Sequence, residues 1–174
     1  MPSTLTTAFL AFASLGLARP SAGGQQQQRC VVPSQYSSSN GTANDSPAIA
    51  DAFKRCGDHS TVAFEQGVDY NVFTPIVADN LDHVTIEMYG NLHLPQNITY
   101  MQQLYNQSTT EDDDDLYWFT LSGPGIQYVG TSNVTTGWIN SYGQAWWDAN
   151  PVNGTGLDGR PHLVSFNTTD GAMR

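Results

Sequence analysis

The segment from Val84 to Leu94 most strongly limits the folds that this chain can adopt. Apolar side chains alternate with polar ones along it, and Gly90 is the one small residue on the apolar side. The apolar positions are Val84, Ile86, Met88, Leu92 and Leu94. A period of two residues is typical of an extended strand that buries one face. We therefore predict a strand over this whole segment.

Shorter strand signals surround that segment, separated by Gly, Asn, Asp and Pro. They cover Thr61–Phe64, Tyr70–Phe73, Leu116–Leu121, Ile126–Val129, Trp138–Ile139 and His162–Phe166. A sandwich, a barrel and a β-solenoid all fit such a series of short strands. The strand clusters recur at roughly 20 to 30 residues, which suits solenoid turns, although no clean internal repeat is present.

One helix is expected before these strands. Ser46 as N-cap and Pro47 at the first helical position are a typical helix start. Ile49, Phe53 and Cys56 then fall on one face at helical spacing, and Gly57 is placed to end the helix. The sequence thus predicts a short amphipathic helix followed by an all-β region.

The start of the chain has the features of an export signal. Leu5 to Leu17 is apolar, is too short to span a bilayer, and ends among small residues. We predict a signal peptide over 1–18, a flexible Gln-rich leader over 19–29, and a folded domain over 30–174. No later segment is apolar enough to span a membrane, so we expect a secreted, extracellular protein without a membrane contact.

Cysteine and sequon content agree with export. Cys30 and Cys56 form an even pair, which favours one disulfide in a secreted chain. Seven Asn-x-Ser/Thr sequons predict a glycoprotein. They are Asn40, Asn44, Asn97, Asn106, Asn133, Asn153 and Asn167, of which Asn44 is the weakest because Pro47 follows its sequon.

The charge balance limits the class of partner. The chain has 6 Lys and Arg against 16 Asp and Glu, a net charge of -10. Nucleic-acid binding needs clustered cations, so we expect no nucleic-acid partner. An acidic polysaccharide would be repelled at neutral pH but less so at pH 4 to 5, because free carboxyls titrate at about 4.

Trp146, Trp147 and Asp148 are the candidate substrate-contacting residues. Indole rings can stack on a sugar and a carboxylate can accept its hydroxyls, although at least one of the two Trp is expected to pack under a loop. The acidic run Glu111–Asp115 reads as a solvated loop, with calcium binding as the weaker alternative. Since none of the four His forms a His-x-His or His-x-x-x-His pair, we expect no metal site and no cofactor.

Several segments, taken in order, resemble one family. They are Asp45–Cys56, Phe64–Tyr70, Asn80–Leu92, Asn91–Asn97, Gly137–Asp148, Trp146–Pro151 and Arg160–Phe166. The chain is similar in them to the polygalacturonase-type pectin hydrolases, glycoside hydrolase family 28, and among these to the fungal exo-acting branch. That resemblance implies a right-handed parallel β-helix of the pectin-lyase type, with the short helix as its N-terminal cap.

The same resemblance implies inverting hydrolysis of galacturonan, with a rhamnogalacturonan or xylogalacturonan hydrolase as the nearest alternative. Members of the family carry their catalytic groups in Asn-Thr-Asp, Asp-Asp, Gly-His-Gly and Arg-Ile-Lys motifs, and this sequence has no such set. Asn167–Gly171 has one Thr too many, and no second carboxylate follows it, so Asp170 is not expected to be catalytic.

We therefore expect a C-terminally truncated N-terminal portion of such an enzyme, inactive alone. It would be a monomer if complete and prone to aggregate through open strand edges if truncated. Two other hypotheses remain open. One is a non-catalytic secreted protein that binds a polysaccharide or an inhibitor protein. The other is a small hydrolase that uses Asp148 and Asp170.

Overall fold

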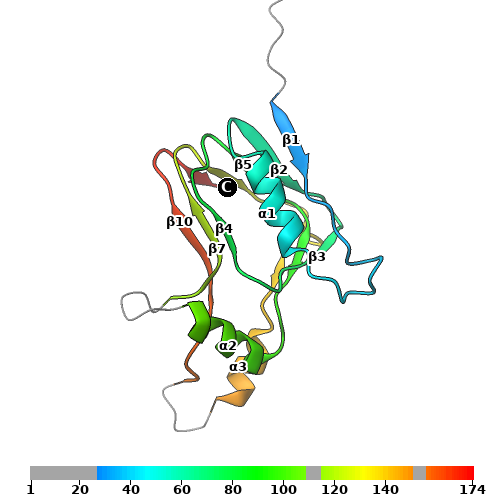
Figure 1. The fold of residues 1–174 in the computed structure, drawn as a ribbon. Coiled ribbons are helices and arrows are strands. Elements are labelled where there is room, and N and C mark those ends of the chain that lie inside the picture. Colours follow the sequence, from blue (N-terminus) through cyan, green and yellow to red (C-terminus); the bar gives the residue numbers. More distant parts are fainter. Residues whose placement is uncertain (1–26, 109–114, 151–155) are drawn as a thin grey trace, which may run out of the picture.

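A computed structural model describes residues 27–108, 115–150 and 156–174 of the chain (Figure 1). The predicted signal peptide (1–18), the first part of the expected leader (19–26), the acids Glu111–Asp114 and the sequon at Asn153 lie outside the described residues. The expected leader does not extend to residue 29, because strand β1 begins at Gln28.

The described residues form short strands with a few helices between them. The helices are α1 (Ser46–Arg55), α2 (Ile98–Ser108) and α3 (Gly143–Ala149). The strands are β1 (Gln28–Val31), β2 (Ser60–Phe64), β3 (Asp69–Asn71), β4 (Ile76–Ala78), β5 (Thr85–Met88), β6 (Asn91–His93), β7 (Tyr117–Ser122), β8 (Gln127–Val129), β9 (Ile139–Asn140), β10 (His162–Asn167) and β11 (Ala172–Met173).

The strands assemble into three sheets in which neighbouring strands are parallel. Their orders are β1-β2-β5-β8-β11, β3-β6-β9 and β10-β7-β4. From β2 onward the chain visits the first, the second and the third sheet, and repeats this order until β11. Each circuit is one coil, and each strand pairs with its equivalent one coil away (Figure 1). This arrangement is consistent with a parallel β-helix.

The predicted single strand over Val84–Leu94 is wrong in one respect, because the segment is two strands. β5 belongs to the first sheet and β6 to the second, and the chain turns between them at Tyr89 and Gly90. The five apolar positions are nevertheless all buried, with exposed fractions of 4% or less. The alternation therefore identified the inward residues correctly. It did not reveal the bend, because it continues without interruption through Tyr89 and Gly90.

Helix α1 caps the first coil as predicted, and its inward residues Ile49, Phe53 and Cys56 are buried. The predicted N-cap is displaced by one residue, to Asp45. The Asp45 carboxylate accepts hydrogen bonds from the backbone N–H of Gln35 (2.7 Å) and of Asn71 (2.9 Å), so it joins the loop before the helix to β3.

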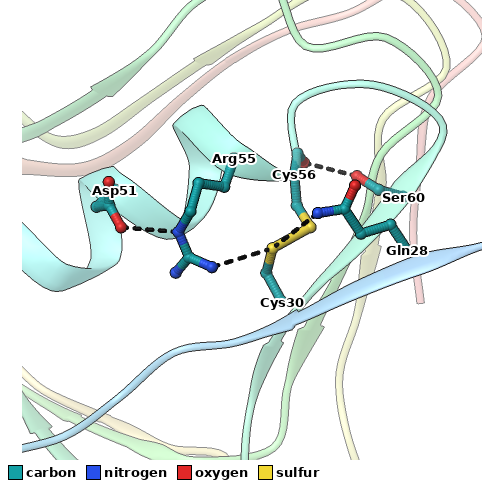
Figure 2. The surroundings of a disulfide bond; sticks show 6 residues. All are labelled: Gln28, Cys30, Asp51, Arg55, Cys56 and Ser60. Atoms are coloured by element: carbon teal, nitrogen blue, oxygen red, sulfur yellow. Dashed lines mark hydrogen bonds and ion pairs between the residues drawn. A yellow bond between two sulfur atoms is a disulfide. The ribbon is translucent and has the colours of Figure 1, made fainter.

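The predicted disulfide between Cys30 and Cys56 is present and links β1 to the end of α1 (Figure 2). Arg55 lies over it, held by an ion pair from its Nε to Asp51 Oδ2 at 2.8 Å. Ser60 donates a hydrogen bond from its Oγ to the Cys56 carbonyl at 2.7 Å. The helix is thereby joined covalently to one edge of the first sheet and by a hydrogen bond to β2.

The turn Phe64–Tyr70 joins β2 to β3 around a buried phenol. Tyr70 is fully buried, accepts a hydrogen bond from the Glu65 N–H at 3.0 Å, and donates one to the Val32 carbonyl at 3.3 Å. Its burial raises its pKa above the ordinary value, since the charged phenolate would lose its hydration. This Tyr therefore ties consecutive coils together as a neutral group.

Two helices were not predicted. α2 follows Asn97, whose Oδ1 accepts the Tyr100 N–H at 3.1 Å as an N-cap would, and it buries Met101. α3 is short, and its N-cap residue Tyr142 has the left-handed conformation. Within the described parts of the chain no helix is long and apolar enough to cross a bilayer.

Candidate functional site

The two predicted tryptophans lie on α3 and point to different surroundings. Adjacent residues of a helix are about 100° apart around its axis, so a Trp-Trp pair cannot share one face. Trp146 is 9% exposed, whereas Trp147 is 76% exposed. One of the pair is thus packed, as the sequence predicts, and the other presents its ring to solvent.

Trp146 is part of the wall of a pocket of about 330 Å³. Its lining residues come mainly from α2, α3 and the start of β10. It is lined by Leu94, Met101, Trp118, Ile139, Ser141, Gly143, Trp146, Arg160, Pro161 and Leu163. Arg160 is the charged residue of this lining, and Ser141 adds a hydroxyl.

This lining suits a flat polar ring that carries a negative charge. Aromatic and aliphatic side chains pack against the apolar face of such a ring. A guanidinium binds a carboxylate through two parallel hydrogen bonds, a geometry that Lys cannot reproduce. Arg160 was missed as a site residue by the sequence analysis. Its signal was its rarity, because the chain has 6 Lys and Arg in all.

Asp148 and Asp170 are far apart in the fold. Asp148 lies on α3, where its Oδ1 accepts a hydrogen bond from Gln144 Nε2 at 2.7 Å. Asp170 lies in the turn after β10, in the left-handed conformation (φ 56°). α3 shares its pocket with the start of β10, and Asp170 follows the end of that strand. Six residues of strand span about 20 Å, while inverting carboxylates stand roughly 6.5–9.5 Å apart.

A second polar and aromatic group, not predicted, covers the outside of the second sheet. The His93 ring stacks on Tyr36 (centroids 5.0 Å apart) and meets Trp138 edge-on at 5.1 Å. Its Nε2 lies 2.9 Å from Asp69 Oδ1, which also accepts a hydrogen bond from Asn91 Nδ2 at 3.1 Å. Asp69 and Asn91 are register partners on β3 and β6, and His93 on β6 also contacts Trp138 just before β9, so these contacts link neighbouring coils.

The last acid of the acidic run is anchored beside β10. Asp115 accepts a hydrogen bond from the Tyr117 hydroxyl at 2.9 Å, and its other oxygen lies 3.1 Å from His162 Nε2. The described end of this run is therefore paired within the protein.

The described sequons differ in how their Asn side chains are used. Asn40, Asn97, Asn106 and Asn167 are exposed, and Asn133 is half-buried. Asn44 is the least suited to a glycan. Its Oδ1 accepts the N–H groups of Ser46 and Phe73, and its Nδ2 donates to Thr74 Oγ1 at 3.3 Å. Glycosylation at Asn44 would require this inward network to break.

Curated fungal proteins are similar to this chain over most of its length. A protein of Aspergillus terreus named "Probable exopolygalacturonase C" is 53% identical over 151 residues, which is 87% of this chain and 33% of that protein. Its Aspergillus niger namesake is 49% identical over 154 residues, 88% of this chain and 34% of the relative. An exopolygalacturonase of Rhizopus delemar is 28% identical over 120 residues, 69% of this chain and 26% of that protein.

The chain spans about a third of the length of the "Probable exopolygalacturonase C" relatives that it matches. No family model matches the sequence, and no solved structure matches it. Identity near one half, sustained along most of the chain, agrees with the motifs that resemble the polygalacturonase-type pectin hydrolases. Over the third of their length that it covers, the chain is a homologue of fungal proteins named exopolygalacturonase.

Proposed function

We propose that this chain is part of a secreted glycoside hydrolase that shortens galacturonan from one end by inverting hydrolysis. The observation that supports this most strongly is the 53% identity, over 87% of the chain, to a protein named exopolygalacturonase. The three parallel sheets visited in a repeated order add support, since they suit the right-handed β-helix that this proposal requires.

In this proposal the chain supplies one wall of the substrate cleft. Arg160 pairs with the carboxylate of a galacturonate unit that enters the pocket, and Ser141 is placed to meet a hydroxyl. Trp147, whose ring faces solvent, stacks on a neighbouring sugar. A net charge of -10 would otherwise repel the polymer, so the position of this one cation matters for binding.

The acid and the base of the reaction are not assigned to residues of this chain. Asp148 lies on α3 before β10 and Asp170 in the turn after β10, which speaks against a third possibility, a small hydrolase built from these two acids. We expect no galacturonate release by the 174-residue chain alone, and exo-type release by a protein that carries the chain together with the two missing carboxylates.

The first test is the deglycosylated intact mass of the native protein, captured from the culture medium with an antibody to residues 80–96. A mass at least twice that of the 174-residue chain, with galacturonate release from polygalacturonate, supports the hydrolase. A mass that matches the processed chain, with no release, supports a non-catalytic binding protein instead. Absence from the medium contradicts secretion.

The second test addresses the pocket. Arg160→Gln is expected to weaken the binding of trigalacturonate to the native protein by at least tenfold, because one charge-assisted interaction is worth roughly 1.5–3 kcal/mol. Arg55→Gln is the matched control, since Arg55 is an exposed Arg on α1. Calorimetric titration measures both. Equal affinities for the two variants would remove Arg160 from the site.

A further inference from the structure

Two Asp-His pairs occupy equivalent positions in consecutive coils. Asp58 and His59 precede β2, and Asp82 and His83 precede β5. Asp58 and Asp82 form a parallel bridge, and the His59 N–H donates to the Asp82 carbonyl at 2.7 Å. The two pairs are therefore one coil apart and directly adjacent, although they are well separated along the sequence.

Both histidines have the left-handed backbone conformation, with φ 41° at His59 and φ 49° at His83. This conformation is uncommon for residues other than Gly, although Asn, Asp and His adopt it more often than the rest. It places the two imidazole rings in a stack, with centroids 4.9 Å apart and planes 20° from parallel. The backbone thus places the His59 and His83 rings side by side, just before β2 and β5.

Each imidazole is oriented by the Asp that precedes it. His59 Nδ1 lies 2.6 Å from Asp58 Oδ1, and His83 Nδ1 makes the equivalent contact with Asp82 Oδ1. A ring that donates its Nδ1–H to a carboxylate keeps the lone pair of Nε2 for a ligand. Carboxylate-oriented imidazoles of this kind are the usual ligands of zinc in proteins.

A third donor stands beside the two rings. One ligand atom from each of His59, Asp82 and His83 lies within 4.8 Å of the other two. All three side chains are at least partly exposed, so their side-chain torsions are free to change towards the roughly 2.0–2.2 Å metal–ligand distances of zinc.

The next coil leaves room for this arrangement. The position equivalent to His83 is Gly125, where an added Cβ would lie 2.7 Å from His83 Cδ2. Any other residue would therefore push against the His83 ring. The stack of the His59 and His83 rings is therefore followed, in the next coil, by a residue without a side chain.

We propose that His59, His83 and Asp82 bind a divalent transition-metal ion of the zinc type. On binding, the Asp82 carboxylate turns from His83 Nδ1 to the ion, while Asp58 keeps positioning His59 from behind. Two imidazole nitrogens and a carboxylate oxygen suit Zn²⁺, and the fourth position is open to water. Ca²⁺ and Mg²⁺ prefer oxygen ligands and fit poorly. The ion would join two coils at their corner. This site is independent of the proposed hydrolysis.

The expectation of no metal site followed from spacing along the sequence. Close His-x-His spacings identify ligands on one helix or strand, but a coiled chain also brings together residues that are one coil apart. The repeated Asp-His dipeptide is the signal that would have revealed the pair.

Calorimetric titration of the untagged chain with ZnCl₂ tests the proposal. The unaltered protein should bind one equivalent, and His59→Asn and His83→Asn should each lower the affinity at least tenfold. Asn tolerates the left-handed conformation, so these changes remove a ligand with little backbone cost. His162→Asn is the matched control, since His162 is exposed and also lies beside one Asp.

Two further readouts decide the case if an Asn variant folds poorly. Asp58→Asn keeps all three ligands and should weaken Zn²⁺ binding by about tenfold, as the loss of an orienting partner does. In the unaltered protein, Zn²⁺ should shift the imidazole NMR signals of His59 and His83 and leave those of His93 and His162 in place. Binding unchanged in all three variants, or no saturable binding at all, would overturn the proposal.

Discussion

Gly90 lies in the corner between β5 and β6 and packs closely against the preceding coil. A Cβ at this position would lie 2.5 Å from Tyr70 Cε2 and 2.9 Å from the carbonyl oxygens of Glu65 and Val68. Two of these neighbours are backbone atoms, which cannot move aside without disturbing the turn. The side chain is thus excluded by contact, and the chain bends here because Gly permits the approach.

Gly90→Ala is accordingly expected to destabilise the protein by roughly 1–3 kcal/mol, the usual cost of overpacking a filled site. Urea denaturation followed by tryptophan fluorescence measures the change. Gly143→Ala is the control, since its Cβ would meet nothing closer than Ser141 Oγ at 3.7 Å. Equal midpoints for the two variants would show that the corner can relax.

At the scale of elements, α1 depends on its links to the first sheet. Its inward face is packed on the core, its last turn carries Arg55 and Lys54, and Cys56 directly after it is bonded to β1. The disulfide closes a loop with a sequence separation of 26. Closing a loop of this size lowers the entropy of the unfolded chain, which favours the folded state.

Replacing both cysteines, as Cys30→Ala with Cys56→Ala, should lower the free energy of unfolding by about 3.5 kcal/mol in the chain-entropy model. Ser60→Ala removes only the neighbouring hydrogen bond to the Cys56 carbonyl and should cost about 1 kcal/mol. Thermal denaturation with and without a reductant measures both. If reduction does not shift the midpoint of the unaltered protein, the link contributes no stability.

The elements also show what the sequence could predict. α1 and the longer strands β2, β7 and β10 have clear periodic or capping signals, and the structure confirms them within a residue or two. β4 and β11 have three and two residues, too few for any period to be read. These two strands form because β7 and β8 pair with them, and such pairing depends on the assembled coils and not on the local sequence.

Much of the candidate site could not be predicted from the sequence, because it also depends on how the coils assemble. The sequence identified Trp146 and Trp147 by residue type, but Arg160 shares a pocket with Trp146 only because α3 meets the start of β10. The pairing of His59 with His83 likewise depends on the coil register. Each of these contacts connects residues on different coils or elements, and their spacing along the sequence varies with the length of the intervening excursion.

The stability of the molecule as a whole should depend on pH in the alkaline range. Tyr128 on β8 packs against the core, and burial raises its pKa to about 12. In the unfolded chain a tyrosine ionises at about 10. The folded state therefore keeps its full stability below pH 10 and loses part of it as the pH rises from about 10 towards 12.

The loss attributable to Tyr128 should reach about 2–3 kcal/mol near pH 12, from about 1.4 kcal/mol per pKa unit. Urea denaturation between pH 8 and pH 11.5 measures it for the unaltered protein and for Tyr128→Phe, which cannot ionise. The difference between the two should widen as the pH rises. Parallel curves would place the Tyr128 pKa near its ordinary value.

Two coils leave the stack at the same corner. The chain goes from β6 to β7 through α2, and from β9 to β10 through α3, whereas β3 and β4 are joined by a short turn (Figure 1). The strands on both sides keep their register despite these detours. Longer surface detours cost little additional closure entropy. This corner is therefore a natural grafting point, where a segment can be exchanged for one of another length and the scaffold beneath it keeps its shape.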